Sequence, residues 1–232
     1  MLIVFDSAIT ESRIMQFKEI ISKSTLKLEL IKIDATEKNK SQETLSKIHS
    51  VLVENKFSRD CLVIGMGGGI VCDIAGFSAA TYQRGVNFLL IPTTLLAQVD
   101  ASVGGKTAIN HPKGKNMIGA FHQPIGVIAD TSFLQTLPER EISCGLSEMI
   151  KHRLINDINY FCWLEENIEQ ILRLEAESIE EAIGKSIEIK TIYVKEDEKE
   201  ANIRALLNFG HTFGHAIELM GEFEDYNHGE AV

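Results

Sequence analysis

Three of the seven histidines lie in the last 22 residues of the chain, as His211, His215 and His228. His211 and His215 are four residues apart, so on a helix both rings would project from one face. No glutamate follows His211 directly, which disfavours the HExxH chemistry of metalloproteases. This concentration of imidazoles predicts either a metal site or a buried polar network.

A carboxylate is available to the same group, because Glu148 lies on an otherwise apolar helical segment. A buried glutamate requires a partner. Glu148, His211 and His228 would give a divalent cation a shell of nitrogen and oxygen ligands with open positions for substrate. His215 would then stand one helical turn away as a proton-transfer group. The alternative is a satisfied polar network between helices without a metal.

A basic, glycine-rich stretch covers residues 100–116 and contains Lys106, Lys115 and Asn116. Arg84 and Lys151 add two more cations nearby in the sequence. Such a stretch favours a phosphate or a carboxylate as ligand, although a solvated basic loop has the same composition. Its spacing does not match the Walker loop of nucleotide triphosphatases.

A third candidate site follows the apolar run at residues 61–65, where glycines 67–69 lead into an apolar segment at 70–76. Strand, glycine turn and helix start can cradle a diphosphate, because backbone N–H groups there carry partial positive charge. The spacing is not GxGxxG, so a structural turn remains an alternative. Asp73 could bind a ribose hydroxyl or cap the helix. Thr93 and Thr94 end another buried strand, at the sheet edge where ligands bind.

The elements that must position these residues fall into two groups. Short apolar runs at 2–5, 28–33, 61–64 and 88–91 predict buried parallel strands, with helices at 12–24 and 41–55 between them. After residue 134 the pattern becomes helical, at 141–155, 158–176, 179–193 and 201–220. We therefore predict an α/β domain at residues 1–137 and an all-helical domain at 138–232, divided near Pro138.

Composition excludes several classes of function. A formal charge of −10 argues against nonspecific binding to nucleic acid or to an anionic membrane. No apolar run approaches the ~18 residues needed to cross a bilayer. The four scattered cysteines form no CxxC pair, which favours the reducing cytoplasm.

Four runs together resemble the 3-dehydroquinate synthase family, over nearly the whole chain from about residue 34. They are GGGIVCDIAGFSAATYQRG at 67–85, PTTLLAQVDASVGGK at 92–106, GKNMIGAFHQP at 114–124 and LNFGHTFGH at 207–215. The resemblance implies a Rossmann-like NAD domain joined to a helical metal domain, with the active site between them. Its implied cofactors are NAD and a divalent metal, zinc or cobalt.

The reaction that this resemblance implies is the conversion of 3-deoxy-D-arabino-heptulosonate 7-phosphate to 3-dehydroquinate and phosphate, in the shikimate pathway to chorismate and the aromatic amino acids. Bound NAD would oxidise the substrate transiently, so that phosphate elimination becomes feasible, and would then be regenerated. The expected partners are this phosphorylated sugar acid and further copies of the chain.

The resemblance also implies roles for individual residues. The positions that match metal ligands are Glu148, His211 and His228. Those that match NAD-binding residues are Glu37, Lys40, Gly68, Gly69, Asp73, Thr93, Thr94, Lys106 and Lys115. Those that match substrate-binding residues are Arg84, Asp100, Lys106, Lys115, Asn116, Lys151, Lys190, Arg204 and Asn208. Those that match catalytic groups are Lys106, Glu200, Arg204 and His215.

Two departures and three alternatives accompany the resemblance. Family members carry further residues before Met1 and a helical stretch after Val232, so we expect a chain that is cut short at both ends. Another sugar phosphate cyclase would share the fold, although VGGK at residues 103–106 favours 3-dehydroquinate synthase. A metal-dependent alcohol dehydrogenase is disfavoured by the many lysines and arginines. A noncatalytic, truncated NAD-binding paralogue is the alternative from a different class.

Overall fold

The computed structural model describes residues 1–23, 26–156, 158–221 and 226–232. The side chains of residues 156, 158, 159, 215 and 219 are also outside the description. Two compact units make up the described chain: Met1–Pro92 with Gly105–Ala129, and Thr93–Gly104 with Asp130–Val232. The second unit thus takes one short segment from within the sequence of the first. The predicted domain boundary after residue 137 stays a prediction, because compactness alone does not show which segments fold independently.

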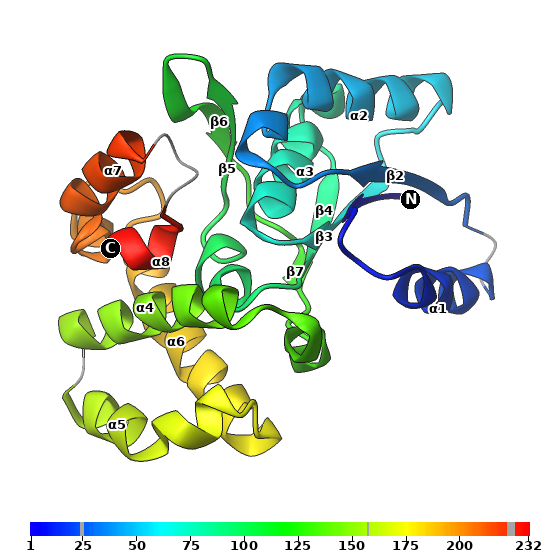
Figure 1. Ribbon diagram of the computed structural model, residues 1–232. Coiled ribbons are helices and arrows are strands. Elements are labelled where there is room, and N and C mark those ends of the chain that lie inside the picture. Colours follow the sequence, from blue (N-terminus) through cyan, green and yellow to red (C-terminus); the bar gives the residue numbers. More distant parts are fainter. Residues whose placement is uncertain (24–25, 157, 222–225) are drawn as a thin grey trace. The chain divides into compact units, whose positions relative to one another are not determined.

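The first unit is built on a five-stranded parallel sheet in the order β2-β1-β3-β4-β7 (Figure 1). Its strands are β1 (Leu2–Asp6), β2 (Glu29–Ile33), β3 (Leu62–Gly67), β4 (Asn87–Pro92) and β7 (Gly126–Val127). Leu2, Ile3 and Val4 are fully buried, as expected for a parallel strand that is covered on both faces. The four predicted strands are confirmed; the two-residue β7 has too little pattern to be recognised.

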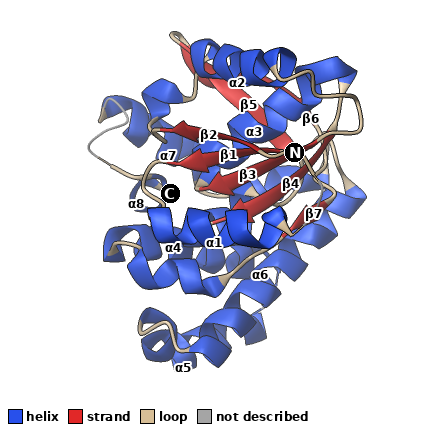
Figure 2. Ribbon diagram, turned by 90° about the vertical axis from the view of Figure 1, so that its right-hand side faces the viewer, coloured by secondary structure: helices blue, strands red, loops and turns tan. Residues whose placement is uncertain are grey.

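Three helices accompany this sheet: α1 (Glu11–Ser22), α2 (Gln42–Glu54) and α3 (Gly69–Thr81). In Figure 2, α1 lies on one face of the sheet, while α2 and α3 lie on the other. Gly67 lets α3 approach β3 closely, since a Cβ at that position would come within 2.5 Å of Val71 Cγ2. The predicted sequence of strand, glycine turn and helix is confirmed, with Gly68 as the N-cap of α3.

The basic stretch is not a solvated loop, which corrects one of the two interpretations given above. Most of it forms an antiparallel hairpin of β5 (Lys106–His111) and β6 (Gly114–Phe121). The hairpin lies against α3, and a Cβ at Gly76 would come within 2.5 Å of Thr107 Cγ2. The two strands lack the alternation of buried and exposed residues that is typical of a half-buried strand, so no strand pattern is visible in the sequence here.

The second unit is helical. Its α-helices are α4 (Glu139–Asn156), α5 (Ile158–Leu172), α6 (Ala176–Glu196), α7 (His211–Met220) and α8 (His228–Ala231). Its shorter helical segments are the π-turn η3 (Ala97–Ala101) and the 3₁₀ segments η4 (Thr131–Thr136) and η5 (Ile203–Asn208). The single helix predicted at 201–220 is divided into η5 and α7. Gly210 takes a φ of +83° between them, which L residues rarely adopt and which ends the first segment.

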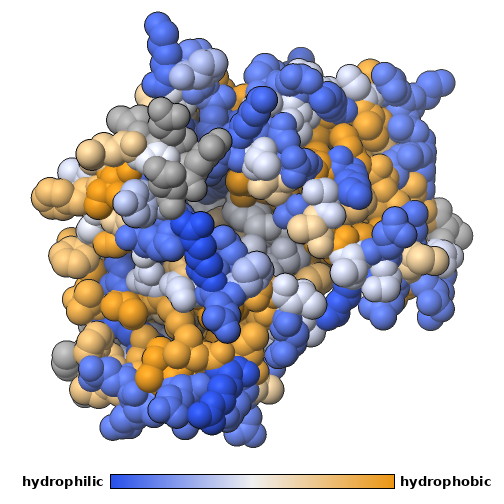
Figure 3. Space-filling model, in the orientation of Figure 1, coloured by the Kyte–Doolittle hydropathy of each residue, from blue (hydrophilic) through white to orange (hydrophobic). Residues whose placement is uncertain are grey.

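Helix α7 presents its apolar side chains outward. Phe213 and Met220 are 78% and 86% exposed, and apolar surface is visible over this helix in Figure 3. Glu218 of the same helix is only 6% exposed. This arrangement reverses the usual pattern of a surface helix and points to polar chemistry beneath it. Among the described residues, no helix is long and apolar enough to span a membrane.

Candidate functional site

The first unit holds a group of polar residues that we call the Lys40 cluster: Glu37, Lys40, Asp73, Asn110, Lys115 and Asn116. Lys40 is 5% exposed, and its Nζ donates to Asp73 and, over 2.5 Å, to Asn116 Oδ1. Asp73 lies in the second turn of α3 and Gly68 is the N-cap, so the capping role considered for Asp73 is wrong. Its residues come from four places: the 3₁₀ helix η1 (Glu37–Asn39) with the residue that follows it, helix α3, strand β5 and strand β6.

Asn110 links the remaining members of the Lys40 cluster. Its Nδ2 donates to Glu37 Oε2 over 2.7 Å, and its Oδ1 accepts from the backbone N–H of Asn116 over 3.0 Å. Asn116 takes a φ of +57°, a conformation that asparagine tolerates better than most residues. Lys115 Nζ lies 3.6 Å from Glu37 Oε1. Asn110, which sequence reasoning missed, therefore binds three of the five predicted site residues of this cluster: Glu37, Asn116 and, through its backbone N–H, the Lys40 carbonyl.

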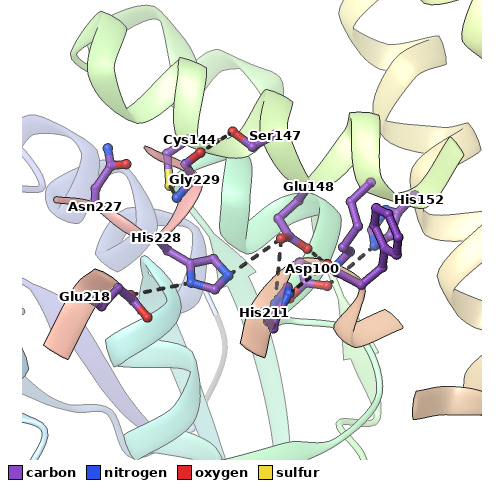
Figure 4. A network of polar contacts seen from close by, with 12 residues as sticks. Asp100, Cys144, Ser147, Glu148, His152, His211, Glu218, Asn227, His228 and Gly229 are labelled. Atoms are coloured by element: carbon purple, nitrogen blue, oxygen red, sulfur yellow. Dashed lines mark hydrogen bonds and ion pairs between the residues drawn. The ribbon is translucent and has the colours of Figure 1, made fainter. Parts of the chain in front are cut away.

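The second unit holds the Glu148 cluster: Asp100, Glu148, Lys151, His152, Lys190, His211 and His228 (Figure 4). Glu148 is fully buried on α4, with Oε1 directed at two imidazoles. That oxygen lies 3.8 Å from His211 Nε2 and 3.6 Å from His228 Nε2. The two rings meet edge to face, with centroids 4.9 Å apart. The three predicted metal ligands thus converge.

This geometry fits a divalent ion. Glu148 Oε1 is buried and has no hydrogen-bond partner among the described residues, although such an oxygen normally has one. A zinc ion with bonds of ~2 Å in tetrahedral geometry separates its ligand atoms by roughly 3.3 Å. The ligand atoms of these residues lie within 4.8 Å of one another, so small side-chain adjustments would suffice. One carboxylate and two imidazoles form a donor set that zinc and cobalt accept.

Electrostatics favour the ligating forms of two of the three residues. Burial and Asp100 raise the pKa of Glu148, but His228 and Lys151 together hold it below its usual value, so the carboxylate is ionised. Burial, assisted by Lys151, lowers the pKa of His211, which leaves this imidazole neutral. Burial also lowers the pKa of His228, but Glu148 and Glu218 raise it to about 9. His228 must therefore lose a proton before it can bind a metal.

Two local structures orient the rings of His211 and His228. His211 begins α7, and its Nδ1 contacts the Phe209 carbonyl over 3.2 Å, which turns Nε2 toward Glu148. His228 begins α8, a helix of four residues that is too short to be stable alone. A capping box between Asn227 and Glu230 closes it, and Arg140 binds the Glu230 carboxylate with two hydrogen bonds of 2.9 and 2.6 Å.

Gly229 fastens α8 to α4. Its N–H donates to Cys144 Sγ over 3.1 Å, and its carbonyl accepts from Ser147 Oγ over 2.8 Å. A Cβ at this position would come within 2.5 Å of Cys144 Cα, so the backbones can approach this closely only with a glycine. Because α4 carries Glu148, this contact sets the position of His228 relative to its partner ligand.

Two family models match the chain, described as "3-dehydroquinate synthase N-terminal" over residues 30–144 and "3-dehydroquinate synthase C-terminal" over residues 145–232. The chain belongs to the 3-dehydroquinate synthase family. The curated 3-dehydroquinate synthase of Teredinibacter turnerae is 49% identical over 231 residues, which cover 100% of this chain and 64% of that protein. The one from Saccharophagus degradans is 53% identical over 196 residues, or 84% and 54% of the two chains.

Solved structures show the same fold. 2-Epi-5-epi-valiolone synthase from Streptomyces hygroscopicus, with NAD+ and Zn2+ bound, matches with a TM-score of 0.92 at 29% identity, over 99% of this chain and 64% of that one. 2-Deoxy-scyllo-inosose synthase, complexed with carbaglucose-6-phosphate, NAD+ and Co2+, matches with a TM-score of 0.88 at 28% identity, over 99% and 62%. The α/β fold predicted with a helical second part is thereby confirmed. The chain spans between 54% and 64% of the length of its curated relatives.

Asp100 organises the cations of this 3-dehydroquinate synthase family member beside the three candidate ligands. It lies in the π-turn η3, where Lys190 Nζ donates to its Oδ1 and to its carbonyl, both over 2.6 Å. Burial raises the pKa of Asp100, but Lys190, Lys151 and His152 hold it well below its usual value. Asp100, Glu148 and His152 could formally hold a second ion. The ammonium groups of Lys190 and Lys151 already neutralise both carboxylates, which disfavours a cation there.

Three further predicted residues follow α6. Arg204 is 2% exposed and donates to the carbonyls of Gly104, over 3.0 Å, and of Glu198. Glu200 takes a φ of +57° and accepts from Asn208 Nδ2 over 2.5 Å. Glu200 and Asn208 are thus joined to each other, while Arg204 is held by backbone carbonyls.

The remaining predicted residues are not members of either cluster as defined above. Arg84 is exposed in the 3₁₀ helix η2 (Tyr82–Arg84), and Lys106 is exposed at the start of β5. Thr93 is buried, and Thr94 Oγ1 accepts from the Ala97 N–H over 3.2 Å. His215 lies in α7, but its side chain is outside the described residues.

Sequence reasoning missed two residues beside the candidate ligands. His152 is fully buried, and its Nε2 lies 3.6 Å from Asp100 Oδ1. It directly follows Lys151, which was predicted from the sequence in its place. Glu218 contacts His228 over 3.5 Å. Its position seven residues after His211, on the same face of a helix, is a signal that could have revealed it.

Proposed function

We propose that this protein is a 3-dehydroquinate synthase, which converts 3-deoxy-D-arabino-heptulosonate 7-phosphate to 3-dehydroquinate and phosphate. The observation that carries the proposal is the buried Oε1 of Glu148, which has no hydrogen-bond partner among the described residues and faces the Nε2 atoms of His211 and His228. The curated relatives, which are 49–54% identical to this chain over 196–231 aligned residues, bear the same name. This activity would place the protein in the shikimate pathway.

Glu148, His211 and His228 would hold a zinc or cobalt ion. The first unit would bind NAD through the start of α3 and the Lys40 cluster, and two similar proteins have been solved with NAD+ bound. When bound, the ion polarises the hydroxyl group that is oxidised, and NAD accepts a hydride and later returns it. Of the Lys40 cluster, Asp73 is the member suited to a ribose hydroxyl, because a carboxylate accepts two hydrogen bonds from a diol.

The cations of the second unit would bind the anionic groups of the substrate. Lys151 and Lys190 are held in place by Glu148 and Asp100, so their ammonium groups are oriented before a ligand arrives. Arg204 is fixed by two backbone carbonyls, which leaves its planar fork in a set orientation. Lys106 and Arg84, which are exposed on the first unit, are further candidates for binding an anionic group. Phosphate and carboxylate are the groups that such residues recognise.

Proton transfer would fall to groups near these cations. Burial lowers the pKa of Lys190, although Asp100 opposes the shift, so this ammonium gives up a proton more readily than an exposed lysine. Glu200, held by Asn208, and His215 are the further candidates that the family resemblance implies. We also retain the predictions of a homo-oligomer and of a cytoplasmic location.

One other activity has a specific observation in its favour. The two similar solved structures described above are synthases of 2-epi-5-epi-valiolone and 2-deoxy-scyllo-inosose, at 29% and 28% identity. The much higher identity to curated 3-dehydroquinate synthases favours our assignment. Both alternatives would use the same fold, metal and nucleotide, so only the substrate distinguishes them.

A comparison of three substrates provides the test. Phosphate release would be measured from 3-deoxy-D-arabino-heptulosonate 7-phosphate, sedoheptulose 7-phosphate and glucose 6-phosphate, each with NAD and with zinc or cobalt. We expect release from the heptulosonate only, and its loss when a chelator removes the metal. Release from only one of the other two sugars would reject the assignment. Glu148→Gln should abolish turnover, because it removes the charged ligand.

A further inference from the structure

The His228 ring lies between two carboxylates. Its Nε2 is 3.6 Å from Glu148 Oε1, and its Nδ1 is 3.5 Å from Glu218 Oε1 (Figure 4). An imidazole has only these two polar atoms, so both edges of the ring are engaged. The side that faces Glu148 is the side that the proposed metal would occupy. The other side therefore serves a different purpose.

Glu218 is not part of the group of ligand atoms that converge on one point, which consists of Glu148, His211 and His228. It is nevertheless a buried carboxylate, 6% exposed, on a helix whose apolar residues point outward. Burial of such a group is unfavourable unless the charge is partnered. Its position, seven residues after His211, places both side chains on the same face of α7, within about 20° of each other.

The contact has a chemical consequence. A neutral imidazole carries one proton, and the nitrogen that lacks it is the one that binds a metal. If Nδ1 keeps its proton and donates it to Glu218, the lone pair of Nε2 is directed at Glu148 Oε1. Carboxylates behind metal-bound histidines fix the ring and increase its basicity in this way.

We propose that Glu218 is a positioning residue for the metal site, which orients His228 and fixes its Nδ1–H tautomer. This inference rests on the proposed function, because it assumes that Glu148, His211 and His228 hold a divalent ion. Helix α7 then has a double role: His211 at its start is a ligand, and Glu218 near its end holds the other imidazole. The outward orientation of Phe213 follows from this use of the inner face.

Metal affinity provides a test that needs no turnover. Zinc and cobalt binding to the purified chain would be measured by competition with a chromophoric chelator, for the parent and for Glu218→Ala and Glu218→Gln. We expect Glu218→Ala to weaken binding by about 10- to 100-fold, the usual effect of losing such a partner. Glu218→Gln should weaken it less, because the amide oxygen still accepts from Nδ1–H. It also keeps the shape of the side chain and guards against misfolding.

A second readout separates positioning from a structural role. In the zinc-loaded parent, the Nδ1–H proton of His228 should give a slowly exchanging NMR signal. Glu218→Ala should make this signal exchange faster, while the visible spectrum of bound cobalt keeps the intensity of an unchanged ligand set. A change of cobalt ligand number in Glu218→Gln would show that Glu218 is a ligand and would overturn the proposal.

Two further variants make the outcome unambiguous. Glu181→Gln, on the exposed side of α6, removes a carboxylate that pairs with Lys185 and should leave metal affinity unchanged. Glu148→Gln should abolish binding. If it does so while both Glu218 variants bind like the parent, the inference about Glu218 is wrong and the metal site stands. If Glu148→Gln itself binds metal like the parent, the metal site of the proposed function is wrong.

Discussion

The Lys40 cluster and the Glu148 cluster are both made of opposite charges, but only one of them is complete without a ligand. In the Lys40 cluster, the ammonium is bonded to Asp73 and Asn116, and Asn110 links the remaining members. In the Glu148 cluster, Glu148 Oε1 and both ring nitrogens of His152 are buried without a hydrogen-bond partner among the described residues. Buried polar atoms without partners are rare in stable proteins.

This difference shows where the molecule stores unfavourable free energy. The Lys40 cluster satisfies its own polar atoms, so it can shape a nucleotide site without a ligand being present. The Glu148 cluster and the neighbouring Glu218 together place three carboxylates beside buried imidazoles. The free energy of this group falls when a cation or a substrate supplies the missing contacts. Shifted pKa values accordingly gather in the second unit, where Asp100, Glu148, Lys190 and His228 all titrate abnormally.

Removing one ammonium from the Glu148 cluster should have the largest effect. Lys190→Met leaves the partly buried Asp100 without its partner at 2.6 Å; breaking a fully buried pair destabilises by about 3–5 kcal/mol, and the 25% exposure of Asp100 places this loss toward the lower end. Urea unfolding of the metal-free chain would measure this loss. Lys195→Met, an exposed lysine on the same helix, should change stability by less than about 0.5 kcal/mol. Equal effects of both substitutions would show that the ion pair between Lys190 and Asp100 contributes no more to stability than an exposed lysine does.

Two glycines of the second unit give a second, smaller effect. Gly229→Ala places a Cβ within 2.5 Å of Cys144 Cα, so α8 must move away from α4, at about 1–3 kcal/mol. Because His228 moves with α8, zinc affinity should fall together with stability. Gly184→Ala lies inside α6 with nothing within 4 Å of the new Cβ, and should stabilise by about 0.5–1 kcal/mol. Thermal melts with and without zinc would test both; unchanged zinc binding in Gly229→Ala would refute the positioning of His228 by α8.

The sequence revealed the residues whose type and spacing indicate chemistry, and it did not reveal those that act through tertiary contacts. Glu148, His211 and His228 were identified by residue type and spacing, and the structure brings their ligand atoms together. Strands β1, β3 and β4 were visible as apolar runs, because most of their residues are buried inside the sheet. Asn110, His152 and Glu218 were missed because each acts through a tertiary contact that leaves little trace in local composition.

Two features of the fold could not be predicted for similar reasons. The β5–β6 hairpin has no alternation of buried and exposed residues, and its close approach to α3 depends on Gly76 of that helix, which lies outside the stretch. The division of residues 201–220 depends on the backbone of Gly210, which a helical pattern of apolar residues does not reveal. In α7 the pattern was correct about the helix but did not reveal that Phe213 faces outward.

Metal binding should displace one proton from the Glu148 cluster near neutral pH. The pKa of His228 is raised to about 9, so its folded-state protonation stabilises the metal-free chain below pH 6.5 and is lost as pH rises through 9. The pKa of Glu148 and that of His211 are both lowered, so neither carries a proton at pH 7. Zinc affinity should therefore increase about tenfold per pH unit from 7 to 8.5. Calorimetry in buffers of different ionisation enthalpy counts the proton; release of none would refute the raised pKa.

The smallest effect is expected in the Lys40 cluster. Lys115 Nζ lies 3.6 Å from Glu37 Oε1, with side chains 23% and 40% exposed, so water screens the pair. Lys115→Met should reduce the free energy of unfolding by no more than about 1 kcal/mol, and less at high salt, because Asn110 still holds Glu37. Urea unfolding at low and high salt, run beside Lys190→Met, gives the comparison directly. A loss as large as that of Lys190→Met would mean that the Lys40 cluster also depends on buried charge, and the distinction between a cluster that is complete and one that awaits a ligand would fail.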